Sequence, residues 1–248
     1  MSKQPEMSRR QLRRQQIRRT QTRNRLTTIG CVTIVAAVAA FFLIYPNLKP
    51  VGGIATAEPF PRPQAQAYTA GDPDAPIRIE EFSDFQCPFC GRFYRDTERQ
   101  LVDAYVATGK VQFVYRSFGL GIGPESEAAA EAAYCAGDQD RFWEMHDIIF
   151  ANQTAENVGD YTDRRLRAFA ETIGLEMSEF GSCFDSGKYS DQVDQDLRDG
   201  QAAGVNATPT FIITYTVGGE TRTRTIAGAH PFTEFQTQID AALAEMGE

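Results

Sequence analysis

The chain has 248 residues and a formal net charge of −8, from 25 basic and 33 acidic side chains. This charge is divided sharply, because residues 1–25 carry Lys3 and eight arginines against the single acid Glu6, and the rest of the chain has twice as many acidic as basic residues. An acidic body of this kind argues against a nucleic-acid partner. The basic arm is typical of a cytoplasmic topology determinant that contacts anionic lipid.

An uncharged and strongly apolar segment follows the basic arm. Residues 26–45 provide the roughly 20 residues that an α-helix needs to cross about 30 Å of hydrocarbon, so we expect one transmembrane helix that contacts the lipid bilayer. Because an arginine-rich arm favours the cytoplasm, we expect a single-pass protein of the cell membrane. Its C-terminal body would then lie outside the cytoplasm.

A cleaved signal peptide is the alternative interpretation. Ala55-Thr56-Ala57 has the small-residue pattern of a cleavage site. The basic arm is long, however, the apolar run exceeds that of a typical signal peptide, and the site lies well beyond its end, so the sequence favours an uncleaved anchor. Residues 46–76 are rich in proline, glycine and alanine. They predict an extended linker before a folded body at 77–248, which has the size of one domain.

The body begins with an alternating segment at 77–83, which predicts a β-strand. Alternation places Glu81 on the strand face whose other positions are isoleucines. A helix is expected from the cysteine pair that follows to about Thr108, where Gly109 fits its end, and a second strand is expected at 111–116.

Helical patterns fill the chain from about residue 120 to 200. We expect helices at 125–136, 141–151, 162–173 and 190–203. A β-hairpin with strands at 210–217 and 220–226 follows across Gly218-Gly219, and a last helix is expected at 232–246. The order is strand–helix–strand, helical insert, strand–strand–helix, which is an α/β arrangement with an inserted helical domain.

The segment Cys87-Pro88-Phe89-Cys90 carries the clearest chemistry. Two cysteines three positions apart, between a predicted strand and a predicted helix, are typical of a thiol–disulfide exchanger. The unpaired N–H groups and the dipole at a helix N-terminus stabilise a thiolate, which is the attacking species. At this spacing the second thiol reaches back to resolve a mixed disulfide.

The three remaining cysteines have different settings. Cys31 lies in the apolar run and is expected to act there as a small apolar residue. Cys135 and Cys183 both lie in the helical insert, where they form either a structural disulfide or two unpaired buried thiols. A zinc site at the vicinal pair is disfavoured because only His146 and His230 could add ligands, and neither stands near another candidate ligand in the sequence. Both histidines are expected to be structural.

Three segments together resemble the DsbA-like thiol–disulfide oxidoreductases of the thioredoxin superfamily. They are Ile79–Cys90, Phe142–Asp147 and Gly204–Phe211. The resemblance covers about residues 77–246, and it implies a thioredoxin fold interrupted by a helical domain.

The resemblance also implies roles for single residues. Cys87 would be the exposed nucleophile and Cys90 the resolving cysteine. Pro209, which by itself could be an ordinary trans proline before a strand, would be a cis-proline beside the disulfide. Thr208 would offer backbone groups to a bound substrate strand. Glu81 would be a buried carboxylate that assists proton transfer, whereas the strand pattern alone also allows a surface position.

Two further points follow from the resemblance. A disulfide between Cys135 and Cys183 is similar to that of membrane-anchored members. Phe89 is a departure, because strongly oxidising members have a histidine at this position that helps to stabilise the thiolate, and phenylalanine cannot. A less oxidising pair is therefore expected.

The sequence as a whole predicts an enzyme without a cofactor that forms disulfides in reduced or misoxidised exported proteins. The resemblance implies a membrane reoxidase as its partner. A reductase or isomerase that works from the dithiol is the first alternative. A redox-inert chaperone or binding module on the same scaffold is the second, although such a module has no need for a cysteine pair that caps a helix.

Overall fold

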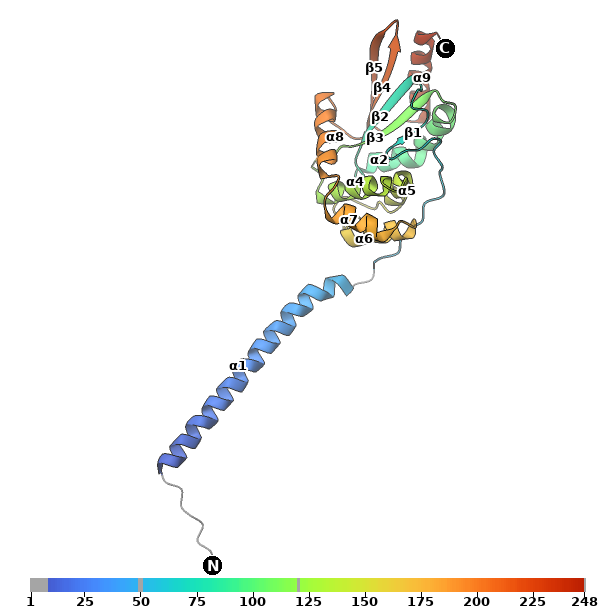
Figure 1. The fold of residues 1–248 in the computed structure, drawn as a ribbon. Coiled ribbons are helices and arrows are strands. Elements are labelled where there is room, and N and C mark those ends of the chain that lie inside the picture. Colours follow the sequence, from blue (N-terminus) through green and yellow to red (C-terminus); the bar gives the residue numbers. More distant parts are fainter. Residues whose placement is uncertain (1–8, 49–50, 120, 248) are drawn as a thin grey trace, which may run out of the picture. The chain divides into compact units, whose positions relative to one another are not determined.

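A computed structural model describes residues 9–48, 51–119 and 121–247 (Figure 1). These residues fall into two compact units, which are divided after residue 50. The first unit consists of helix α1, Arg9–Leu48. Within the described part of the chain, Asn24–Phe41 is the one helical stretch long and apolar enough to cross a membrane, and none of it is buried.

The second unit begins earlier than the sequence predicted. Residues 51–76 belong to the same compact unit as the rest of the body. Phe60 and Arg62 are buried within it, and strand β1, Thr69–Ala70, pairs with the body's sheet. The linker expected at 46–76 is therefore corrected from Val51 onward, because this proline-rich segment buries side chains against the body.

Five strands form one mixed sheet in the order β1-β3-β2-β4-β5 (Figure 1). Strands β2 and β3 are parallel, and every other neighbouring pair is antiparallel. The strands expected from the sequence have the following bounds: β2 Ile77–Ser83, β3 Val111–Ser117, β4 Thr210–Val217 and β5 Glu220–Ala227. Strand β2, which leads into the cysteine pair, lies at the centre of the sheet.

A helical rod connects β2 to β3. It consists of α2, two π-helical turns and the short helix α3, and its parts are Pro88–Phe93 (α2), Tyr94–Glu98 (η1), Arg99–Leu101 (α3) and Val102–Val106 (η2). The C-terminal helix α9, Phe232–Met246, packs against β4 and α3. The crossover of β2, rod and β3 is the parallel unit that places a helix N-terminus at the end of the central strand.

The helical insert lies between β3 and β4. Its helices are α4 Pro124–Gly137, α5 Phe142–Ala151, α6 Asp163–Thr172, α7 Met177–Asp185 and α8 Ser190–Ala202. Helix α4 packs against α5, α6, α7 and α8, so it organises the insert (Figure 1). The sequence did not predict α7 because Gly181 and two serines interrupt its apolar pattern.

Aromatic packing fixes the rod and α9 on one face of the sheet. The ring centroid of Phe93 lies 4.5 Å from that of Phe211 and 5.4 Å from that of Phe235. Glu81 of β2 has Phe211 and Tyr115 as its register partners on the two neighbouring strands. Glu81 therefore lies on this buried face, beneath the helix that carries the cysteine pair.

Candidate active site

Cys87 is the N-cap residue of α2, and Pro88 occupies the first turn. Proline suits this turn because its missing N–H would have no partner there. The Cys87 residue is 5% exposed and Cys90 is completely buried, whereas Phe89 between them is 53% exposed. Both cysteines are free thiols in this structure. The structure thus places one thiol at the helix N-terminus and the other in the core. The expectation that Cys87 is exposed is corrected, because the surrounding chain buries it.

Hydrogen bonds and burial give the two thiols different pKa values. The hydrogen bond with the Cys90 thiol has the largest effect on Cys87. Together with hydrogen bonds from the Thr208 side chain and from the N–H groups of Cys90 and Phe89, it lowers the pKa of Cys87 to about 6, although burial opposes this shift. Burial and the neighbouring Cys87 raise the pKa of Cys90 well above its usual value. Of the two, Cys87 is therefore the residue that exists as a thiolate near neutral pH.

The peptide bond between Thr208 and Pro209 is cis, and it lies directly beside Cys87. The Cys87 Sγ donates a hydrogen bond to the carbonyl oxygen of Thr208 at 3.4 Å. Cys87 and Thr208 lie far apart in the sequence. They meet because β4, which follows Pro209, pairs with β2.

Glu81 is 1% exposed, in agreement with the face expected from the strand alternation. Burial raises the pKa of Glu81 well above its usual value, and the negative charge of Glu98 adds to this shift. One carboxylate oxygen of Glu81 has no hydrogen-bond partner among the described residues. A buried acid of this kind retains its proton near neutral pH and can exchange it with a neighbour.

A buried ion cluster, which the sequence did not predict, lies on the same helical rod. The guanidinium of Arg62 is fully buried and forms ion pairs with Glu98 at 2.6 Å and with Asp147 at 2.8 Å. The rings of Phe60 and Trp143 lie 4.2 Å and 4.4 Å from its central carbon. Arg62 thus joins the segment before the sheet to the rod and to helix α5. Its position in a proline-rich stretch gave no sequence signal of burial.

The helical insert also holds the loop that leads into α2. The Gln153 side-chain amide donates to the carbonyl oxygens of Phe85 and Cys87 at 2.8 Å and 2.9 Å. The hydroxyl of Tyr161 donates to the Phe85 carbonyl at 3.1 Å. The Cys87 carbonyl also accepts the N–H of Gly91 at 3.1 Å. The insert thus adds hydrogen bonds to the backbone on either side of the first cysteine and contributes directly to the geometry of the cysteine pair.

Both histidines contact other groups of the fold. His146 is 1% exposed, and its Nδ1 lies 2.9 Å from a carboxylate oxygen of Asp147. Six aromatic rings surround it, those of Phe85, Tyr94, Tyr115, Phe142, Trp143 and Phe150. His230 contacts the carbonyl oxygen of Ala227 through Nε2 at 3.0 Å. Within the described ranges, no three His, Cys, Asp or Glu side chains gather as metal ligands would.

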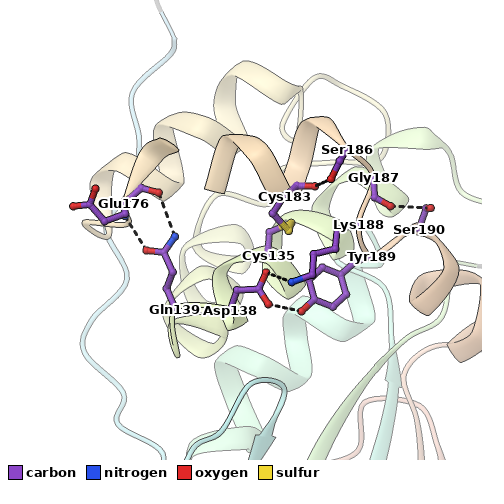
Figure 2. The surroundings of a disulfide bond; sticks show 10 residues. All are labelled: Cys135, Asp138, Gln139, Glu176, Cys183, Ser186, Gly187, Lys188, Tyr189 and Ser190. Atoms are coloured by element: carbon purple, nitrogen blue, oxygen red, sulfur yellow. Dashed lines mark hydrogen bonds and ion pairs between the residues drawn. A yellow bond between two sulfur atoms is a disulfide. The ribbon is translucent and has the colours of Figure 1, made fainter. Parts of the chain in front are cut away.

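Cys135 and Cys183 form a disulfide that joins α4 to α7, so of the two arrangements open from the sequence the structure has the bonded one (Figure 2). Their Cα atoms are 5.8 Å apart, and the sequence separation is 48 residues. Asp138 reinforces this junction, because it accepts hydrogen bonds from Lys188 and Tyr189, each at 2.6 Å (Figure 2). Closing a loop of this length corresponds to about 4 kcal/mol in the chain-entropy model.

Comparisons with known proteins agree with this fold. The family model described as "Thioredoxin" matches residues 64–241. A solved structure, alpha-DsbA1 from Wolbachia pipientis, superimposes with a TM-score of 0.64 at 22% identity, and the match covers 75% of this chain and 94% of that one.

Two curated relatives show different contexts for the same domain. The chain is 29% identical over 148 residues to "Probable disulfide bond formation protein D" of Bacillus cereus, which covers 58% of this chain and 68% of that protein. It is 31% identical over 147 residues to "Na(+)/H(+) antiporter NhaA 1" of Salinispora arenicola, which covers 59% of this chain and 21% of the antiporter. The chain thus spans about a fifth of the length of that relative.

The family match covers most of the chain, and it includes both the cysteine pair and the cis-proline. The chain therefore belongs to the thioredoxin family, and its fold is similar to that of alpha-DsbA1.

Proposed function

We propose that this oxidoreductase acts as an oxidase that introduces disulfides into exported proteins through the Cys87–Cys90 pair. The observation that carries the proposal is the low pKa of Cys87, about 6, at the N-cap of α2. A stabilised thiolate lowers the free energy of the reduced protein relative to the disulfide form. The disulfide is then the less stable state and is readily donated to a substrate.

The reaction follows from the separation of the two thiols. A substrate thiolate attacks Cys87 Sγ in the disulfide form, which produces a mixed disulfide and expels Cys90 as a thiolate. A second substrate thiolate then attacks the substrate sulfur of the mixed disulfide. The substrate leaves with its new disulfide, Cys87 leaves as the stabilised thiolate, and the enzyme is left as a dithiol.

Glu81, Thr208 and Pro209 support these steps in the proposal. Burial gives Glu81 a proton near neutral pH, and it supplies this proton to the departing Cys90 thiolate. When Glu81 is ionised, its charge adds to the raised pKa of Cys90, which supports the proximity of the two groups. The backbone of Thr208, held beside the nucleophile by the turn at Pro209, offers hydrogen bonds to an extended substrate segment.

Phe89 bears on the direction of the reaction. The Phe89 ring is exposed and lies 5.1 Å from the guanidinium carbon of Arg92. Because the ring has no N–H or O–H group, it adds no hydrogen bond to the thiolate. We therefore expect an oxidase that is weaker than one with a histidine at this position. The reductase or isomerase remains the alternative with the same chemistry.

Substrates and membrane context complete the proposal. The partners are reduced or misoxidised exported proteins, and a membrane reoxidase removes two electrons from the dithiol after each cycle. Residues 26–45 anchor the enzyme, with residues 1–25 in the cytoplasm and the catalytic body outside it. The backbone of Ala55 exchanges two hydrogen bonds with the Asn152 side chain, at 2.9 Å and 2.8 Å. Cleavage after Ala57 would remove this contact, which favours an uncleaved anchor.

Stoichiometric transfer tests the proposal. The oxidised full chain is mixed in detergent with an equal amount of a reduced peptide that contains two cysteines, and both redox states are followed by mass spectrometry after acid quenching. We expect the peptide to gain its disulfide as the Cys87–Cys90 pair becomes a dithiol. Cys87→Ser should abolish transfer, and Cys90→Ala, which cannot form the Cys87–Cys90 disulfide, should transfer none either. A Cys87→Ser chain that remains active on the peptide contradicts the proposal.

The cellular direction is tested with the same Cys90→Ala variant. In cells it should trap exported proteins as mixed disulfides. Recovery of a membrane electron donor alone would indicate the reductase.

A further inference from the structure

Asp84, the residue after β2, holds its carboxylate in a network that joins the cysteine loop to the helical insert. One oxygen accepts the backbone N–H of Gln86 at 2.8 Å, and the other accepts the hydroxyl of Ser126 of α4 at 2.9 Å. The Gln86 side chain donates to Ser126 at 3.0 Å and accepts the N–H of Asn157 at 2.6 Å. Asp84 is 2% exposed, so its charge lies away from solvent screening.

The backbone of Asp84 contacts both thiol-bearing residues. Its N–H donates to the Cys90 Sγ at 3.4 Å, and its carbonyl oxygen accepts the N–H of Cys87 at 3.0 Å. The residue that carries this carboxylate therefore contacts both thiol-bearing residues through its backbone. In this poorly screened position, the negative charge of the Asp84 carboxylate disfavours the negative charge of the Cys87 thiolate.

Other ionisable groups also lie near Asp84 and Cys87. Glu81 interacts with Cys87, but burial raises the pKa of Glu81 well above its usual value. Burial raises the pKa of the Tyr115 and Tyr161 phenols above the usual value, so both stay neutral. Glu156 also faces Asp84, but it is exposed. Burial raises the pKa of Asp84 to about 6, and the charge of Cys87 contributes to this shift. Asp84 and Cys87 thus titrate in the same range.

We propose that Asp84 is a positioning residue that sets the reactivity of Cys87: it fixes the loop through Gln86 and Ser126, and its ionised carboxylate opposes the Cys87 thiolate. The inference rests on Cys87 being the nucleophile of the proposed function. Because each negative charge disfavours the other, the two groups lose their protons in coupled steps, and the thiolate appears over a broader pH range than a single group requires.

Asp84→Asn tests this coupling, because the amide keeps the size and the turn-forming oxygen of the carboxylate and removes the charge. The thiolate absorbance of the reduced full chain in detergent is followed from about pH 4 to about pH 9. We expect a broadened curve for the wild type and a steeper one with a lower midpoint for Asp84→Asn. The rate of Cys87 alkylation near pH 6 should rise about 1.5-fold, because a fall of half a unit from a pKa of about 6 raises the thiolate fraction by that factor.

The equilibrium with glutathione gives a second readout. The repulsion exists only when Cys87 is a thiolate, so at neutral pH Asp84→Asn should stabilise the dithiol over the disulfide by a factor of about three, which corresponds to half a pKa unit. Transfer to a peptide substrate is measured separately. If transfer fails while the titration still sharpens, the proposed function is wrong and the inference about Asp84 stands.

Two control variants distinguish an effect of the Asp84 charge from an effect of the loop geometry. Glu156→Gln removes an exposed charge from the same region and should leave the curve unchanged. Ser126→Ala keeps the Asp84 carboxylate and should keep the broadened curve. The proposal is overturned if Asp84→Asn and the wild type give superimposable curves, or if Ser126→Ala sharpens the titration as Asp84→Asn does.

A measurement on the wild type alone covers the case in which Asp84→Asn does not fold. By reciprocity, the Asp84 carboxyl should titrate at lower pH in the disulfide form, which has no Cys87 thiolate, than in the dithiol form. Carboxyl-carbon NMR detects this difference. Equal titration in the two forms overturns the proposal.

Discussion

At the scale of single residues, the site gives identical groups different chemistry through their surroundings. Cys87 and Cys90 are both thiols, yet the hydrogen bond with the Cys90 thiol and those of the helix N-terminus lower the pKa of Cys87, and burial raises the pKa of Cys90. Among the carboxylates, Glu98 is paired with Arg62, whereas Glu81 has no cation paired with it among the described ion pairs and keeps its proton. Environment, more than residue type, sets the acidity of each group.

Glu81→Gln should slow the step that releases Cys90 from the disulfide. The amide cannot donate a proton, and loss of a positioned general acid costs about tenfold or more. In stopped-flow measurements of mixed-disulfide formation, the wild-type rate at a fixed concentration of substrate thiolate should fall as the pH rises through the raised pKa of Glu81. The variant should lack this fall. Equal pH profiles would assign Glu81 a purely structural role.

The same substitution should change how stability depends on pH. The pKa of Glu81 is raised in the folded state above its usual value of 4.5. Its contribution is therefore fully present below about pH 4.5 and is lost as the pH rises toward the folded pKa, at about 1.4 kcal/mol for each pH unit. Urea unfolding of Glu81→Gln and wild type should show a gap in unfolding free energy that widens in favour of the variant from about pH 5 to pH 8. Parallel curves would argue against the buried, protonated acid.

At the scale of elements, side chains from outside the thioredoxin core hold the helical rod of the active site. Gln153 of the insert contacts the loop before α2, and Arg62 contacts the rod from the segment before the sheet. The disulfide between Cys135 and Cys183 ties α7 to α4, which itself carries Ser126. The helical insert and the segment before the sheet thus help to hold the active-site helix in place.

Arg62→Met should destabilise the body strongly. The substitution leaves Glu98 and Asp147 buried without their cation, which typically costs about 3–5 kcal/mol. Arg167→Met is a suitable control, because Arg167 pairs with an Asp185 side chain that is 71% exposed, and such pairs contribute roughly 0–1 kcal/mol. Denaturant unfolding measures both. Equal and small losses would show that the buried cluster contributes no more than a surface ion pair.

The sequence predicted those elements that have a strong local signal. The alternation in β2 placed Glu81 on the buried face, and the glycine pair at 218–219 marked the hairpin of β4 and β5. The burial of Arg62 depends on partners 36 and 85 residues away, so no local pattern could reveal it. The two-residue strand β1 and the interrupted helix α7 are likewise stabilised by tertiary contacts.

At the scale of the whole molecule, the chain has a basic, apolar N-terminal unit and an acidic catalytic unit. The proposed anchor would keep the oxidase at the membrane surface, close to the reoxidase that regenerates it. Membrane attachment then limits the search for this partner to two dimensions, and the acidic body would favour substrates with basic surfaces.

Anchoring is tested by fractionation. The full chain should remain with the membrane after alkaline carbonate extraction, and protease added outside the cytoplasmic membrane should digest the body but protect residues 1–25. A chain that begins at residue 51 and is exported by an unrelated cleaved signal should be soluble. Recovery of the full-length product as a soluble protein cut after Ala57 would contradict the anchor.

The reduction potential of the Cys87–Cys90 pair tests the central claim most directly. It is measured by equilibrating the purified full chain with glutathione buffers and quantifying the dithiol by alkylation, with Asp84→Asn measured alongside. With Cys87 stabilised as a thiolate and Phe89 in place of a histidine, we predict a value between about −120 mV, the level of a strong oxidase, and about −230 mV. A value at or below about −270 mV, the level of thioredoxin, would contradict the oxidase and indicate a reductase.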